Sequence, residues 1–163
     1  MSDRPHGTLD FFATAIPLLW IGLVLGVSFI ATPAKFQAEN LDGALALAIS
    51  VVTFAWLHMA EAALGVVTAL LLLLTKARAV QWTLFVVAAI CLALQVDWIL
   101  PGFQGNAGHI PQLPTLDFRQ LHAVFAATEG LKILALVGLA VLAFRGGGRP
   151  REIETVGLSS AAR

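Results

Sequence analysis

The sequence has 163 residues, of which 58% are hydrophobic and only 12% are charged, and its mean hydropathy is +0.85. Soluble domains carry about 25% charged residues, so the composition predicts an integral membrane protein. The formal net charge is zero, which excludes the basic surface typical of nucleic-acid-binding proteins. A single cysteine, Cys91, excludes an internal disulfide framework and a cysteine-rich metal site.

Four apolar segments reach the length of about 20 residues that a helix needs to cross a bilayer. Pro101-Gly102 is expected to end the third helix, and the glycines of residues 146–148 the fourth. The sequence therefore predicts an all-α, integral membrane four-helix bundle over residues 1–145, followed by a flexible polar tail at 146–163. The four helices are predicted at about 11–31, 41–75, 80–100 and 117–144.

Basic residues are distributed unevenly between the two ends of the predicted helices. One end carries Arg4, Lys76, Arg78, Arg145, Arg149, Arg151 and Arg163, whereas the other carries Lys35 and Arg119. Because short cytoplasmic segments of membrane proteins are enriched in Lys and Arg, both termini are predicted to lie on the cytoplasmic side. The expected location is the plasma membrane, which is the inner membrane in a bacterium.

Ionisable residues inside the apolar segments are the main functional signal. A charged side chain in hydrocarbon is costly, so it usually faces the protein interior, a water-filled cavity or a bound ion. His58 and Glu61 share one side of the second helix, and His122 and Glu129 share one side of the fourth. These four are the predicted ligands of a site near the outer half of the bilayer. Supporting or cavity residues are predicted to be Gln95, Asp97 and Lys132, the last of which can pair with Glu129.

Imidazole and carboxylate groups together suit iron, zinc or manganese. Two histidines on separate helices also suit axial ligation of a haem. The alternative is that these residues satisfy one another by hydrogen bonds and only hold the helices together. The tryptophans, Trp20 among them, are predicted to serve packing alone.

Three short motifs carry a family resemblance that covers most of residues 12–145. They are GVSFIATPAKF at 26–36, VDWILP at 96–101 and DFRQLH at 117–122. Together they resemble the transmembrane protein 205-like family, a four-helix integral membrane group whose activity is largely undefined and which is associated with drug resistance and trafficking. The family has Gly after the motif histidine, Ser at +3 and Asn at +7. Here these positions are Ala123, Phe125 and Glu129, so only His122 is carried over from the family pattern.

Three functions are compatible with this sequence. The first is binding of a metal ion or small solute at the His/Glu site, for transport or resistance. The second is a membrane metalloenzyme, an oxidoreductase that uses non-haem iron or haem on a lipid-soluble substrate. The third is a structural subunit of a membrane complex. The lipid bilayer is the expected partner in each case, together with further copies of the chain or a larger membrane complex, and no nucleic acid.

Overall fold

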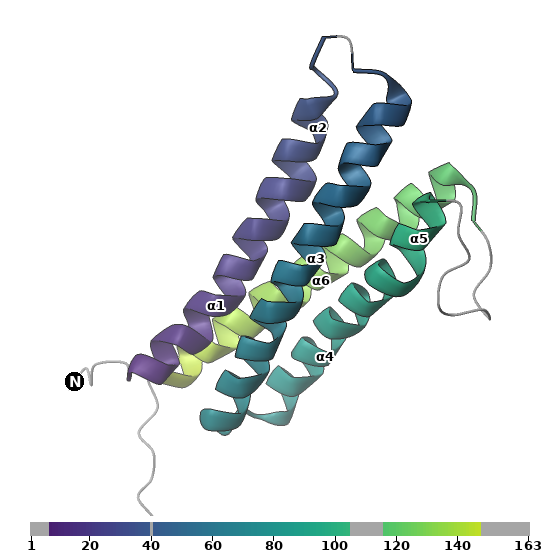
Figure 1. Ribbon diagram of the computed structural model, residues 1–163. Coiled ribbons are helices and arrows are strands. Elements are labelled where there is room, and N and C mark those ends of the chain that lie inside the picture. The colour runs from purple at the N-terminus through teal and green to yellow at the C-terminus, as the bar shows by residue number, and fades with distance from the viewer. Residues whose placement is uncertain (1–6, 40, 105–115, 148–163) are drawn as a thin grey trace, which may run out of the picture.

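The computed structural model describes residues 7–39, 41–104 and 116–147, and every regular element within these ranges is a helix (Figure 1). The chain begins with α1 (Thr8–Val24), the π-helical segment η1 (Leu25–Ala31) and α2 (Thr32–Lys35). It returns through α3 (Gly43–Leu74). The next elements are α4 (Ala79–Leu94), the π-helical segment η2 (Gln95–Ile99) and α5 (Leu100–Phe103), and α6 (Phe118–Gly147) is the last. The all-α prediction is confirmed for the described residues.

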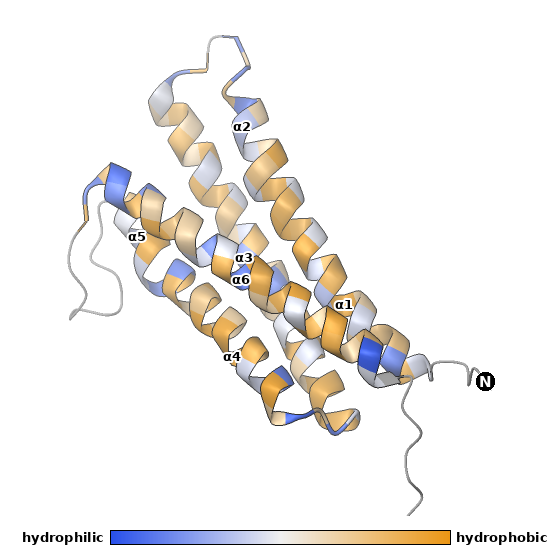
Figure 2. Ribbon diagram, turned by 180° about the vertical axis from the view of Figure 1, so that it is seen from behind, coloured by the Kyte–Doolittle hydropathy of each residue, from blue (hydrophilic) through white to orange (hydrophobic). Residues whose placement is uncertain are grey.

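Four continuous helical rods are long and apolar enough to cross a membrane: Thr8–Lys35, Gly43–Leu74, Ala79–Phe103 and Phe118–Gly146. Most of their residues are hydrophobic (Figure 2), and many large apolar side chains are exposed. Leu19, Trp56 and Leu134, for example, are 59%, 67% and 69% exposed. Soluble monomers rarely expose large continuous apolar surfaces, whereas a hydrocarbon solvent accommodates them. These features indicate an integral membrane protein.

One predicted helix end was wrong, because Pro101-Gly102 does not end the third rod. The first rod continues beyond residue 31 to Lys35, and the third continues through Pro101 to Phe103. Pro33 and Pro101 each lie in the first turn of a new α-helical segment that follows a π-helical one. Proline is tolerated in a first turn, where its missing N–H is not needed for an intrahelical hydrogen bond.

Side-chain caps mark the beginning of two helices. The Asp42 carboxylate accepts a hydrogen bond from the Leu45 backbone N–H (2.7 Å) at the start of α3. At the start of α6, Asp117 accepts from the backbone N–H of Gln120 (2.8 Å), and the Gln120 side chain accepts from the backbone N–H of Asp117 (3.0 Å). Such reciprocal caps satisfy N–H groups that have no intrahelical partner.

The rods form two pairs that lie close together at one end of the bundle and diverge toward the other (Figure 1). The first pair is α1–α2 with α3, and the second is α4–α5 with α6. Where the pairs meet, α6 packs extensively against both α1 and α4. The hydrophobic core between the pairs consists of Trp20, Ile21, Val24, Ala88, Leu92, Ala135 and Leu136. A pocket lies between the diverging pairs, with residues of α2 and α5 in its lining.

The beginning of α1 and the end of α6 lie at the same end of the bundle (Figure 1). An even number of crossings requires this arrangement, and the cytoplasmic location of that end stays a prediction. The predicted loop before the fourth helix and the predicted tail lie largely outside the described residues, which omit 105–115 and 148–163.

Candidate functional site

The interior of the bundle holds one ammonium group between two carboxylates. Lys132 on α6 places its Nζ 2.5 Å from Oε1 of Glu61 on α3 and 2.8 Å from Oε2 of Glu129 on α6. All three side chains are at most 1% exposed. The predicted pairing of Glu129 with Lys132 is confirmed, and the contact with Glu61 joins α3 to α6. Buried ion pairs of this kind need further hydrogen bonds to offset the loss of hydration.

Neutral side chains supply those hydrogen bonds. Gln95 accepts from Lys132 Nζ (2.7 Å) and donates through Nε2 to Glu129 Oε2 (2.7 Å). The Trp20 indole N–H donates to Glu61 Oε1 (2.8 Å), and the Ser28 hydroxyl donates to Glu129 Oε1 (2.7 Å). We call these six residues the polar cluster: Trp20, Ser28, Glu61, Gln95, Glu129 and Lys132. Every one of the four rods contributes to it, so it ties them together.

The two π-helical segments converge on Glu129. Ser28 lies in η1 and Gln95 lies in η2, and each donates a hydrogen bond to a different oxygen of the Glu129 carboxylate. A π-helical turn is rare, interrupts the regular α-helical hydrogen-bond pattern and is often found at functional sites. Both departures from α-helical geometry therefore place a donor at the same acidic residue.

His58 lies beside the polar cluster without joining its hydrogen bonds. Its side chain is 4% exposed, and its Nε2 is 3.9 Å from Glu61 Oε2, beyond hydrogen-bond distance. Neither ring nitrogen of His58 nor Glu61 Oε2 has a hydrogen-bond partner among the described residues. The Phe54 ring lies beside the His58 ring, with ring centroids 6.3 Å apart.

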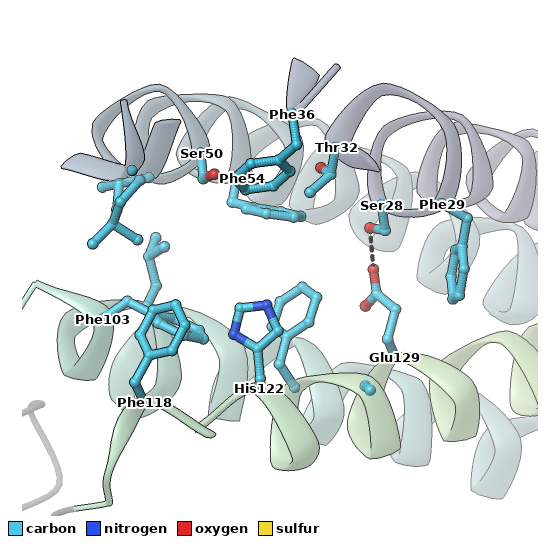
Figure 3. Close-up of a pocket in the computed structure, with 16 residues that line it drawn as sticks. Ser28, Phe29, Thr32, Phe36, Ser50, Phe54, Phe103, Phe118, His122 and Glu129 are labelled. Atoms are coloured by element: carbon cyan, nitrogen blue, oxygen red, sulfur yellow. Dashed lines mark hydrogen bonds between the residues drawn. The ribbon is translucent and has the colours of Figure 1, made fainter. Parts of the chain in front are cut away.

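A pocket of about 440 Å³ adjoins the polar cluster where the two helix pairs diverge. Figure 3 shows Ser28 and Thr32 on one wall, facing His122 and Glu129 on the opposite wall. Its apolar lining includes six phenylalanines: Phe29, Phe36, Phe54, Phe103, Phe118 and Phe125. Ligand pockets are commonly cavities of this size, mostly apolar, with a few polar groups that orient the ligand.

The hydroxyl groups in the pocket wall already donate their hydrogens elsewhere. Ser28 donates to Glu129, Thr32 to the Val27 carbonyl (2.8 Å) and Ser50 to the Ala46 carbonyl (2.8 Å). Because a hydroxyl has one hydrogen and two lone pairs, these groups offer the pocket oxygen acceptors. The Ser50 oxygen accepts from Lys35 Nζ.

His122 lines the pocket apart from the polar cluster. Its ring packs against Phe103 and Phe118, with centroids 5.2 Å and 5.0 Å apart. A neutral imidazole carries one N–H donor and one acceptor. His122 is thus the side chain of the lining that brings an N–H to the pocket.

The predicted site residues fall into two groups. Glu61, Gln95, Glu129 and Lys132 are bonded together, with His58 beside them, whereas His122 belongs to the pocket; Asp97 is half-buried on η2 and does not line the pocket. Within the part of the chain that the structure describes, no group of three His, Cys, Asp or Glu side chains is placed to hold a metal ion. The four predicted ligands therefore do not form one centre, and metal or haem binding stays a prediction without structural support.

Three features of the site were not predicted. Trp20 was expected to serve packing alone, which is wrong, because its indole N–H bonds Glu61. Ser28 was not identified, although a hydroxyl in an apolar helix is a detectable signal. The requirement of a buried tryptophan N–H for an acceptor could have pointed to a hydrogen bond of Trp20. The third feature is the aromatic pocket, whose phenylalanines come from separate helices. Which of these residues meet depends on how the helices rotate about their axes.

Comparison with protein-family models, curated proteins and solved structures gives no match to this chain. The resemblance to the transmembrane protein 205-like family therefore stays a prediction. The fold and the site together define the class: a four-helix protein with apolar, membrane-crossing helices, a buried polar cluster and an adjoining aromatic pocket.

Proposed function

We propose that this protein binds a small lipid-soluble solute inside the membrane, in the pocket between its two helix pairs. The observation that supports this function is the pocket itself, of about 440 Å³, with aromatic walls and two ionisable side chains, His122 and Glu129. A purely structural cluster would need no space beside it. Here Glu129, the carboxylate of the cluster with the larger number of bonded partners, is also part of the pocket wall.

Three phenylalanines of the wall give the pocket a route to the lipid. Phe29, Phe36 and Phe118 are 55%, 62% and 58% exposed, so their rings are partly within the pocket and partly on the outer surface. A solute dissolved in the bilayer can reach the pocket by displacing them. Lipid-soluble solutes are concentrated in the bilayer, which favours entry from that side.

The pocket is lined by residues of α2 and α5, such as Thr32 and Phe103. These elements lie at the opposite end of the bundle from the beginning of α1 and the end of α6 (Figure 1). With the termini on the cytoplasmic side, the pocket faces the outer half of the bilayer. Binding there suits capture of a solute for transport or resistance. A path across the whole membrane would require further copies of the chain or a partner in a membrane complex.

The pocket can be filled by one substitution with a matched control next to it. Ala126 lines the pocket, whereas Ala127 does not, and both are exposed residues of α6. Ala126→Trp is expected to abolish solute binding, because the indole occupies the space, and Ala127→Trp to leave it unchanged. The measurement is photolabelling by adamantyl diazirine in zwitterionic nanodiscs, with labelled residues mapped by mass spectrometry.

In the unsubstituted protein, label is expected on residues of the pocket wall, and Ala126→Trp is expected to lower it by about tenfold or more. Label spread evenly over the lipid-facing residues, with no enrichment in the pocket, would contradict the proposed function. Equal labelling of the two tryptophan variants would contradict it as well.

A further inference from the structure

We infer that the solute is an organic cation, with its charge held against Glu129 and its apolar body among the phenylalanines. This inference rests on the proposed function of the pocket and adds the chemical class of its ligand. It is carried by three observations: the charges of the polar cluster, the hydrogen-bonding character of the pocket wall, and the aromatic lining.

The polar cluster carries a surplus of negative charge. Glu61 and Glu129 share one ammonium group, that of Lys132, so the three side chains sum to −1 when both carboxylates are ionised. Trp20, Ser28 and Gln95 bond to these groups but are neutral. An uncompensated charge in a low-dielectric interior is strongly unfavourable, so the cluster is balanced either by a bound proton or by a cation beside it. A cation placed beside the cluster would therefore be stabilised there.

Glu129 is the negatively charged residue of the polar cluster that lines the pocket. Of the three charged residues, Glu129 alone lines it, while Glu61 and Lys132 lie behind. Its Oε1 accepts one hydrogen bond, from Ser28, and a carboxylate oxygen has a second lone pair. Figure 3 shows this carboxylate directed across the pocket toward Ser28. A ligand cation can therefore contact the same oxygen from within the pocket.

Apart from the His122 ring, which brings one N–H donor to the pocket, the rest of the wall also suits a cation. Ser28 and Thr32 present oxygens because their hydrogens are donated to Glu129 and the Val27 carbonyl. The faces of aromatic rings attract cations, quaternary ammonium groups in particular, and six phenylalanines line the space. Each of these groups would favour positive over negative charge.

One cation lies near the pocket wall. Lys35 Nζ bonds to Ser50 Oγ and lies 5.1 Å from the centroid of the Phe36 ring, and both partners line the pocket. Ser50 and Phe36 are away from Glu129 in Figure 3. An anionic ligand would have to bind near Lys35, away from Glu129. An anionic probe therefore tests whether the pocket prefers negative charge.

The experiment compares three compounds that share a benzyl group and differ in the charge of a head group of similar shape. They are benzyltrimethylammonium, its uncharged isostere neopentylbenzene, and the anion phenylmethanesulfonate. Each competes with adamantyl diazirine for pocket labelling in zwitterionic nanodiscs at about pH 8, above the pKa of an unperturbed imidazole. Concentrations are corrected for partitioning into protein-free nanodiscs.

The cation is expected to compete about tenfold or more better than the neutral isostere, and the anion worst. Equal competition by the cation and the isostere would overturn the cation inference while leaving the proposed function intact. Best competition by the anion would overturn it too. An absence of pocket labelling would instead contradict the proposed function itself, so the two failures are distinguishable.

Two substitutions test the origin of the preference. Glu129→Gln removes the carboxylate in the pocket wall. Glu61→Gln removes the same charge from behind the wall, where no ligand contact is expected, and leaves Glu129 paired with Lys132. Both are expected to reduce the advantage of the cation over the isostere to about threefold or less. Melting followed by circular dichroism checks that each variant is folded. An unchanged preference in folded Glu61→Gln would overturn the surplus-charge argument.

Discussion

Lys132→Met is expected to destabilise the protein by about 3–5 kcal/mol, the range found when one partner of a buried ion pair is removed. Methionine has a similar length but no charge, so the carboxylates of Glu61 and Glu129 would lose the ammonium group that lies 2.5 Å and 2.8 Å from them. Gln95 would lose its donor as well. The measurement is the equilibrium free energy of unfolding in mixed micelles containing a denaturing detergent.

The control for this prediction neutralises all three charges. In the triple variant Lys132→Met, Glu61→Gln, Glu129→Gln, no unpaired charge remains in the interior. Replacing a whole buried ion pair by neutral groups is often close to neutral for stability. The triple variant is therefore expected to recover most of the stability that the single variant loses. A triple variant less stable than Lys132→Met would show that packing of the lysine chain, and not charge balance, sets the effect.

Trp20→Ala is expected to have the second largest effect, a loss of about 3–5 kcal/mol, as for other large aromatic residues truncated in a core. Trp20 is fully buried, packs at the junction of the two helix pairs and donates to Glu61. Trp20→Phe keeps most of the packing and removes the donor, so a smaller loss of about 1.5–3 kcal/mol is expected, typical of a hydrogen bond to a charged group. Unfolding in the same mixed micelles measures both.

Trp56 offers the matched comparison for Trp20. It lies on α3 and is 67% exposed, on the surface that faces lipid. Trp56→Ala is expected to change the free energy of unfolding by about 0.5 kcal/mol or less, as is usual for surface substitutions. Similar losses for Trp20→Ala and Trp56→Ala would contradict the assignment of Trp20 to the bonded core.

The number and order of the helices could be predicted because membrane-crossing length and hydropathy are local properties of the sequence. Glu129 and Lys132 could be paired for the same reason, since they lie one turn apart on one helix. Their contact with Glu61 could not be predicted, because it depends on how α3 and α6 rotate about their axes. The close approach of Trp20 to Gly65, where an added Cβ would lie 3.3 Å from the indole, depends on the same rotation.

The separation of His122 from His58 has a similar origin. Spacing along each helix shows that a histidine and a glutamate share a side, but it does not show which sides face each other. The structure pairs Glu61 with Lys132 and turns His122 toward Phe103 and Phe118. Pro101 misled the prediction of the end of the third helix, because the π-helical segment before it has no reliable sequence signal.

The π-helical segments Leu25–Ala31 and Gln95–Ile99 also bear on how such a chain changes in length during evolution. A π-helical turn closes its hydrogen bond over one more residue than an α-helical turn, so each segment can be viewed as a one-residue insertion. Deleting one residue there would restore an α-helical turn and leave the parts on either side in nearly the same rotation, because the π-helical turn absorbs the extra residue. Aligned descendants of a common ancestor are therefore expected to show single-residue gaps at these two places, accompanied by loss of the partner at Glu129.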